Sequence, residues 1–228
     1  MRADTGAEVG TGSGADAGSA DGLAAHGPRS VEELRAAVAA GQRVKYVFFW
    51  GHAPRRDGSL GPSCFSQWWP SPFTVDGIEY ATAEHWMMAG KARLFGDAEA
   101  ERRAIAAPHP EQAKSVGRTV RGFDDAIWQP RRFDLVVEGS VHKFGQDPAL
   151  REFLLGTNSR VLVESSPLDR IWGIGLAADD ERAEDPARWR GLNLLSFALM
   201  EARQRLAADM PWARAAEPGG AAPHVPES

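Results

Sequence analysis

The strongest constraint on the fold is the helical pattern that begins at Thr82 and continues through most of the chain after it. Thr82 suits an N-cap, because its hydroxyl can accept a hydrogen bond from a backbone N–H of the first turn. The sequence predicts one helix over residues 83–94. Glu84 lies in its first turn, where a carboxylate suits the positive end of the helix dipole. Lys91 follows about two turns later, so both side chains are expected to point the same way.

The remaining elements are predicted from apolar spacing, caps and turn residues. Further helices are expected over residues 30–40, 97–106, 110–116, 131–144, 147–155 and 191–206. Short strands are expected over residues 45–50 and 161–164. Asp76-Gly77 lies between two β-prone pairs and predicts a two-residue hairpin turn within residues 73–80. These elements predict an α+β fold, mainly helical with a few short strands, in one domain over residues 42–207.

Composition limits the classes to which the chain can belong. The chain has 228 residues, of which 43% are hydrophobic and 25% charged, as in ordinary globular domains. Residues 1–29 are rich in small and polar residues and predict a disordered leader, and residues 209–228 predict a disordered tail. No apolar run is long enough for a membrane span, so no membrane association is expected.

The net charge and the cysteine content limit the binding partners and the cellular compartment that fit this chain. The net charge of −5 argues against nonspecific binding to nucleic-acid backbones, although a local basic pocket is compatible with this charge. The single cysteine, Cys64, rules out an internal disulfide and favours a reducing cytoplasm, with the thiol packed in the core. The six histidines show no metal-ligand spacing, so no metal site is predicted.

Outside residues 82–91, three places combine polar groups with apolar surroundings. Lys143 lies near the end of a predicted helix. A loop after a predicted strand runs from Glu164 through Asp169 and Trp172 to Gly173, and glycine there allows close approach of a backbone. Asn193 lies at the start of the last helix, where N–H groups favour anions.

Each of these residues also has an ordinary structural explanation. A glutamate in a first helical turn and a lysine in a last turn are both explained by the helix dipole. Lys91 can be a solvated surface lysine, and Asp169 can cap its own loop. The tryptophans, Trp128 and Trp172 included, can be core residues. The residue types alone therefore predict a domain with a candidate pocket of acid, amine and aromatic groups.

Taken in order, four segments resemble the NADAR family, whose members are also called YbiA-like. The resemblance covers about residues 45–206. Its segments are Phe65-Ser66-Gln67-Trp68 with Val75-Asp76-Gly77; Thr82-Ala83-Glu84-His85 up to Lys91; Lys143-Phe144-x-Gln146 up to Thr157; and Asp169-x-x-Trp172-Gly173-x-Gly175 with Gly191-x-Asn193, closing on Glu201-x-Arg203. Gln67 and Met88 stand where the family usually carries Asn and Gln, which puts the substrate in question.

The resemblance implies a YbiA-like fold and cleavage of an N-glycosidic bond. Some members hydrolyse ribosylaminopyrimidine phosphates, which are early intermediates of riboflavin synthesis. Others remove ADP-ribose from modified bases, notably guanine, so an ADP-ribosylated nucleic-acid base is a possible partner. Both reactions break a C1′–N bond on a phosphorylated ribose, and neither needs a metal or redox cofactor.

The resemblance also suggests roles for residues of this chain. Glu84 is the expected carboxylate near C1′, where positive charge develops. Lys91 or Lys143 is the expected amine for a Schiff base with the opened sugar, and Lys91 is favoured because it shares a helix face with Glu84. Substrate contacts are expected from Trp128 and Trp172 on the base, Asp169 on the ribose or the base edge, Gly173 in its loop, and Asn193 at the last helix.

Two other classes of function remain open at this point. The same pocket in a non-catalytic module would bind ADP-ribose or NAD without cutting it. A purely structural interaction protein would hold Glu84, Lys91 and Asp169 far apart on its surface, because groups that serve one reaction must converge on it.

Overall fold

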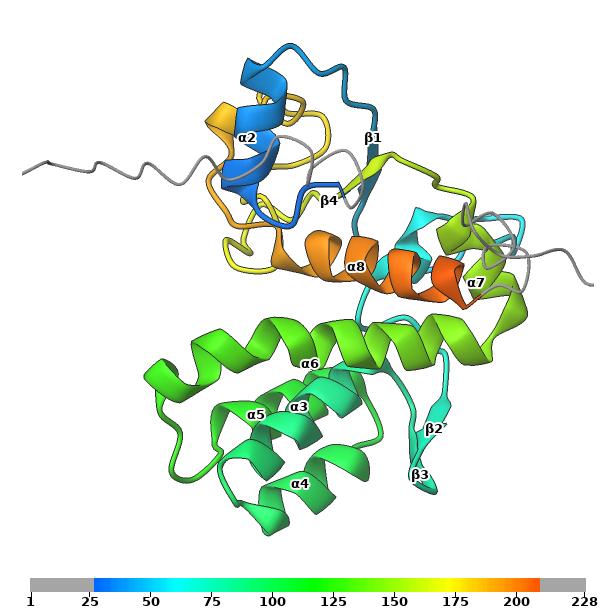
Figure 1. The fold of residues 1–228 in the computed structure, drawn as a ribbon. Coiled ribbons are helices and arrows are strands. Elements are labelled where there is room, and N and C mark those ends of the chain that lie inside the picture. The colour runs from blue at the N-terminus through cyan, green and yellow to red at the C-terminus, as the bar shows by residue number, and fades with distance from the viewer. Residues whose placement is uncertain (1–26, 210–228) are drawn as a thin grey trace, which may run out of the picture.

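The computed structural model describes residues 27–209 (Figure 1). The predicted leader, residues 1–29, and the predicted tail, residues 209–228, lie almost wholly outside this range. Within the described residues, none of the helices is long and apolar enough to cross a membrane.

The described chain is α+β and mainly helical, as predicted. Its helices are α2 (Val31–Ala39), α3 (Ala83–Leu94), α4 (Ala98–Ile105), α5 (Pro110–Arg118), α6 (Asp125–Gln146), α7 (Pro148–Leu155) and α8 (Leu194–Ala208). Its strands are β1 (Tyr46–Phe49), β2 (Phe73–Val75), β3 (Ile78–Tyr80) and β4 (Val161–Glu164). Two short 3₁₀ helices, Pro62–Phe65 and Pro186–Arg188, lie in the connections.

Helix α6 is the centre of the fold (Figure 1). On one side it packs against α3, which in turn packs against α4 and α5, and on the other side it packs against α8. Glycine allows the close approach of α3 and α6: a Cβ at Gly139 would lie 2.3 Å from Cδ1 of Trp86. The indole N–H of Trp86 donates to the carbonyl of Leu135 at 2.9 Å, which fixes this ring between the two helices.

Two small sheets complete the fold. β1 and β4 are parallel, although more than a hundred residues separate them, and Phe49 pairs with Glu164 in the register. β2 and β3 form the predicted hairpin, whose turn residues Asp76 and Gly77 both have positive φ, 51° and 78°. That geometry is the one that Asp-Gly favours in a two-residue turn.

Four helix termini differ from the sequence predictions in position or in capping. Thr82 is the N-cap of α3 by position, but its hydroxyl pairs with Nδ1 of His85 at 2.8 Å and not with a backbone N–H. α6 begins at Asp125 and not at residue 131, because Asp124 caps it and accepts from the N–H of Ala126, so Pro130 lies inside the helix.

α5 continues through Gly117 to Arg118, beyond the predicted end at residue 116. α8 begins only at Leu194, because Asn193 is in the left-handed conformation, with φ of 52°. A left-handed residue stops a helix from extending further back, so the predicted start at residue 191 is wrong.

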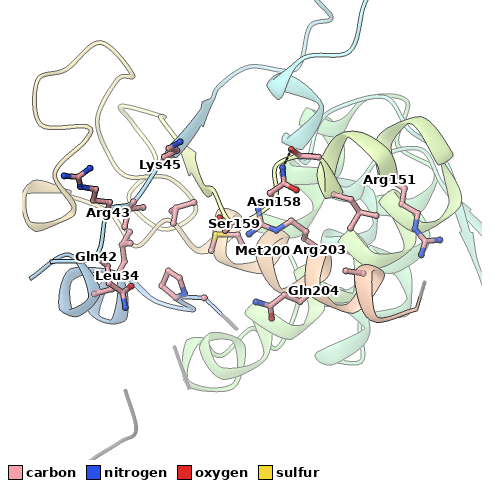
Figure 2. A pocket seen from close by; sticks show the side chains of 18 of the residues that line it. Leu34, Gln42, Arg43, Lys45, Arg151, Asn158, Ser159, Met200, Arg203 and Gln204 are labelled. Carbon is pink, nitrogen blue, oxygen red and sulfur yellow. Dashed lines mark hydrogen bonds between the residues drawn. The ribbon is translucent and has the colours of Figure 1, made fainter. Parts of the chain in front are cut away.

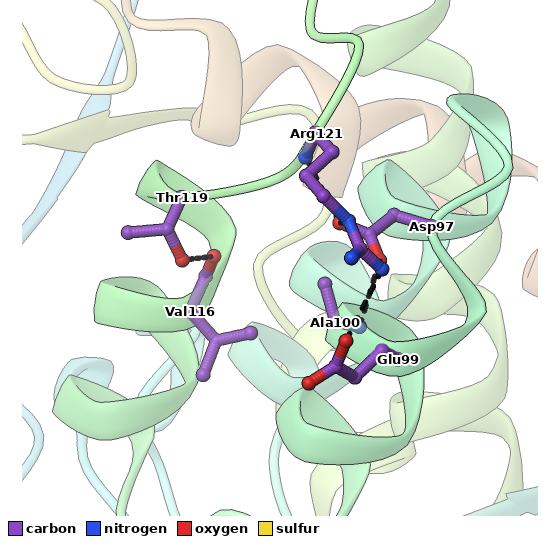
Figure 3. Close-up of polar contacts among 6 residues, drawn as sticks. All are labelled: Asp97, Glu99, Ala100, Val116, Thr119 and Arg121. Atoms are coloured by element: carbon purple, nitrogen blue, oxygen red, sulfur yellow. Dashed lines mark hydrogen bonds and ion pairs between the residues drawn. The ribbon is translucent and has the colours of Figure 1, made fainter.

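An ion pair ties the segment after α5 to the start of α4 (Figure 3). Asp97 caps α4 by accepting from the N–H of Ala100, and it pairs with Arg121 at 2.7 Å. The hydrogen bonds from Arg121 hold the pKa of Asp97 below its usual range. Thr119 donates to the carbonyl of Val116 at 2.9 Å and tightens the end of α5. These contacts hold the end of α5 beside the start of α4.

Candidate active site

Glu84 is a buried carboxylate at the start of α3. Its backbone N–H donates to the carbonyl of Gln67 at 3.0 Å, and the residue is only 3% exposed. Its Oε1 has no hydrogen-bond partner among the described residues. Burial raises its pKa to about 7, against the opposing influence of Lys114 and of Trp68, which faces the carboxylate. A buried carboxylate with an unpaired oxygen is costly unless a ligand or a proton satisfies it.

Glu164 supplies a second carboxylate of the same kind from the carboxyl end of β4. Its backbone N–H donates to Oδ1 of Asn193 and to Oγ of Ser196, both at 3.0 Å. Its Oε2 is buried and lacks a partner among the described residues. Burial, with the negative charges of Asp169 and Glu84, raises its pKa to about 8. The two glutamates are thus close enough to influence each other's ionisation.

Asp169 lies beside both glutamates, since its charge raises the pKa of each. Its Oδ1 accepts from the N–H groups of Ile171 at 2.9 Å and Trp172 at 2.8 Å, as expected of a residue that caps its loop. Both hydrogen bonds end on Oδ1 of Asp169. The purely structural prediction holds Glu84, Lys91 and Asp169 far apart; the structure brings Glu84 and Asp169 together, whereas Lys91 bonds elsewhere.

The cationic side of the site comes from α5. The positive charges of Lys114 and Arg118 lower the pKa of Glu84, and Lys114 does the same for Glu164. The ammonium of Lys114 lies 5.7 Å from the centroid of the Trp68 ring. The ring of His52 lies 5.5 Å from the same tryptophan. These residues form an acidic centre with a basic and aromatic rim.

Neither predicted lysine pairs with Glu84. Nζ of Lys91 donates to the carbonyl of Gly117 at 2.7 Å and lies 4.1 Å from the centroid of the Phe123 ring, and burial lowers its pKa. Nζ of Lys143 donates to the carbonyls of Cys64 and Ser66, at 2.7 and 2.8 Å. Complete burial lowers the pKa of Lys143 to about 7. The pKa of each amine is thus lowered, but both amines are held by backbone carbonyls.

The two tryptophans predicted to contact the substrate lie in different surroundings. Trp172 begins the turn that Asp169 caps, and is half-buried. Trp128 is 8% exposed, and the centroid of its ring lies 5.6 Å from Nζ of Lys91, so this tryptophan lies beside that lysine.

Gly173 and Asn193 hold the acidic loop in position. A Cβ at Gly173 would lie 2.8 Å from the carbonyl oxygen of Glu164, so no larger residue fits. Asn193 is fully buried, and its amide bridges the N–H of Glu164 and the carbonyl of Leu162. Its side chain positions the end of β4 and so orients Glu164.

Sequence reasoning predicted Glu84 and Asp169 for one site, and the structure brings these two carboxylates together; it did not assign roles to Glu164, Lys114, Arg118 or Trp68. Only one signal pointed to Glu164: it is an acid directly after a short apolar strand. Nothing in the sequence distinguishes Lys114 from the other cations of the predicted helices.

Comparison with known proteins identifies the family. The model of the NADAR domain matches residues 48–207, which is most of the described chain. The chain belongs to the NADAR family. The NADAR protein N-glycosidase R617 of Acanthamoeba polyphaga mimivirus is 41% identical over 165 residues, which are 70% of this chain and 95% of the relative.

Two further NADAR relatives are informative. N-glycosidase YbiA of Escherichia coli is 30% identical over 145 residues, and its NMR structure superposes with a TM-score of 0.58, covering 74% of this chain and 88% of YbiA. The riboflavin biosynthesis protein PYRR of Zea mays is 32% identical over 145 residues, which are 60% of this chain and 21% of that protein. Membership of the NADAR family places this chain among the hydrolases of N-glycosyl bonds.

Proposed function

We propose that this N-glycosidase hydrolyses the C1′–N bond of a phosphorylated ribosyl substrate, either a ribosylaminopyrimidine phosphate or an ADP-ribosylated guanine base. The observation that carries the proposal is the pair of carboxylates, Glu84 and Glu164, each with one buried oxygen that no described residue satisfies. The maize relative, named for riboflavin biosynthesis, supports the first of these substrates.

The raised pKa values of the two glutamates suit this chemistry. Cleavage of a C1′–N bond builds positive charge on the sugar and negative charge on the leaving base. With pKa values of about 7 and 8, the pair holds roughly one proton near neutral pH. Glu164, with the higher pKa, is suited to protonate the leaving base, while ionised Glu84 stabilises the cationic sugar or directs water to C1′.

The surroundings of the pair fit a phosphorylated ribose attached to a flat base. Lys114 and Arg118 place positive charge on one side, where a phosphate can pair with it. Trp68 and Trp172 offer aromatic faces for the base, and stacking is worth about 1–3 kcal/mol per base. The free oxygen of Asp169 is available to accept from a ribose hydroxyl. No metal or redox cofactor enters this scheme, and the setting we propose is the cytoplasm.

A Schiff base with a lysine is the competing route for the same reaction. Lys91 and Lys143 both have lowered pKa values, which favours a nucleophilic amine. Each would first have to leave its backbone carbonyls to reach C1′. Treatment of the protein with borohydride and substrate separates the routes: a trapped adduct on either lysine supports the amine, and its absence during turnover supports water attack.

A substrate panel tests the proposal. Full-length protein is incubated with ribosylaminopyrimidine phosphate and with ADP-ribosylated guanosine, and release of the free base is followed by chromatography. We expect release from at least one, with an optimum between pH 7 and 8. Tight calorimetric binding of ADP-ribose without release from either substrate would instead establish the non-catalytic binding module.

A further inference from the structure

A large cavity of the described chain lies away from the paired glutamates. It has a volume of about 1200 Å³ and is bounded by α2, α7, α8 and the starts of β1 and β4 (Figure 2). Binding sites for small molecules usually have volumes of about 300–1000 Å³, so this cavity is large enough for one. We call it the α2–α8 groove.

The α2–α8 groove and the candidate active site share two structural elements. Val161, at the start of β4, lines the groove, whereas Glu164 ends the same strand in the active site. Met200 and Arg203 line the groove from α8, whereas Asn193, just before α8, holds Glu164. The groove therefore lies at the opposite ends of β4 and α8 from the reacting carboxylates.

Positive charge dominates the lining. Four cationic side chains reach the groove and only one carboxylate does; they are Arg43, Lys45, Arg151 and Arg203, against Glu152. Arg151 contributes a buried Nε that has no partner among the described residues. An anion in the groove would thus meet an excess of positive charge in partly desolvated surroundings, where such pairing is strong.

Arg203 is the most informative of these residues. It is 8% exposed, and its Nη1 donates to Oγ1 of Thr157 at 2.7 Å and to the carbonyl of Arg160 at 2.9 Å. Both partners are neutral, and no carboxylate of the described residues pairs with it. Burial lowers its pKa to about 10. A buried guanidinium without a counter-charge is unfavourable by itself, and an anionic ligand would offset that cost.

The remaining lining is suited to an organic ligand. Leu34, Val44 and Met200 give an apolar wall, and Gln42 and Gln204 place amides that can pair with ring nitrogens. Figure 2 shows Arg203 beside Asn158 and Ser159, with Arg43 and Lys45 toward the other end of the groove. Charge and apolar surface thus occur together along one cavity.

We propose that the α2–α8 groove is a second binding site, separate from the reaction centre, for a phosphorylated heterocyclic molecule of nucleotide size. The phosphate pairs with Arg203, and Lys45, toward the other end of the groove, adds to the positive potential that attracts the anion. The ring lies against the apolar wall and hydrogen-bonds to the amides.

Calorimetry on the full-length protein with AMP, adenosine and inorganic phosphate tests the site. To remove binding at the candidate active site, the titrations use the Lys114→Ala variant as background. AMP is expected to bind more tightly than either of its parts, and more weakly as salt rises. Adding Arg203→Met or Lys45→Glu should weaken AMP binding by about tenfold or more, as expected for the loss of a charge-assisted hydrogen bond or pairing.

Two controls keep the test decisive. Lys45 is exposed, and its side chain makes no hydrogen bond or ion pair with the described residues, so Lys45→Glu is expected to fold even if Arg203→Met does not. Arg103→Met removes an exposed arginine of α4 and should leave AMP binding unchanged. Base release by otherwise wild-type protein that carries Lys45→Glu should stay within about twofold. The proposal is overturned if AMP does not bind the Lys114→Ala background, if Lys45→Glu leaves its binding unchanged, or if Lys45→Glu abolishes turnover.

Discussion

Replacing Glu164 by Gln is expected to stabilise the protein at alkaline pH. Burial and the neighbouring charges of Asp169 and Glu84 raise the pKa of Glu164 from its ordinary value of 4.5 to about 8. The folded state therefore holds a proton that the unfolded chain has already released. The resulting stability is fully present below pH 4.5 and is lost as the pH rises to about 8. Glutamine has nearly the same shape and never ionises, so the variant does not suffer this loss.

The size of the effect follows from the pKa. Each tenfold change in proton affinity corresponds to about 1.36 kcal/mol. A rise from 4.5 to about 8 thus gives a loss of up to about 5 kcal/mol of unfolding free energy in the wild-type protein above pH 8. This is a large part of the total stability of an ordinary domain, which is about 5–15 kcal/mol.

Urea unfolding at pH 5, 7 and 9 measures the effect. Glu164→Gln should be close to the wild-type protein at pH 5 and more stable than it by several kcal/mol at pH 9. Glu111→Gln, an exposed glutamate of α5, is the matched control and should follow the wild-type curve throughout. A Glu164→Gln variant that is no more stable than the wild-type protein at pH 9 would refute the reasoning.

Three further predictions concern the framework of the site. Gly139→Ala should lower the unfolding free energy by about 1–3 kcal/mol, because its Cβ would meet Trp86 at 2.3 Å. Gly145→Ala in the same helix should cost less in thermal unfolding, because its Cβ would meet only the flexible end of Leu206, at 3.3 Å. Asn193→Ala should cost about 1–3 kcal/mol in urea unfolding, because it removes the buried amide that accepts from the N–H of Glu164 and donates to the carbonyl of Leu162. The pKa of Asp97 is lowered, so it contributes stability above about pH 4 that is lost as the pH falls; Asp97→Asn should flatten that acid dependence in urea unfolding.

Local patterns were sufficient to predict most of the fold. Asp76-Gly77 specified its hairpin turn, and the caps and glycines near α2, α4 and α7 placed those helices within about two residues. Pairing of β1 with β4 could not be predicted, because parallel strands so far apart in the chain are joined by contacts that no local pattern contains. Pro130 misled the prediction of α6, since proline is common in a first helical turn and rare inside a helix.

The candidate site was only partly predictable, for a geometric reason. Glu84 and Lys91 do share a helix, but seven residues of helix span about 10 Å, so one face does not make one site. In the structure the groups that affect Glu84 come from other elements: Lys114 from α5, and Asp169 from the loop after β4. Tertiary packing also buries Glu164, and this burial is what changes its chemistry. Neither effect can be inferred from residue type.

The most direct test of the central claim is the turnover of Glu84→Gln. Base release from ribosylaminopyrimidine phosphate and from ADP-ribosylated guanosine is measured for the wild-type protein, Glu84→Gln and the control Glu111→Gln. The fold of each protein is checked by circular dichroism. We predict that Glu84→Gln loses about 100-fold or more of the rate on the substrate that the wild-type protein cleaves, while Glu111→Gln keeps it. A folded Glu84→Gln variant that releases base at the wild-type rate would contradict the account.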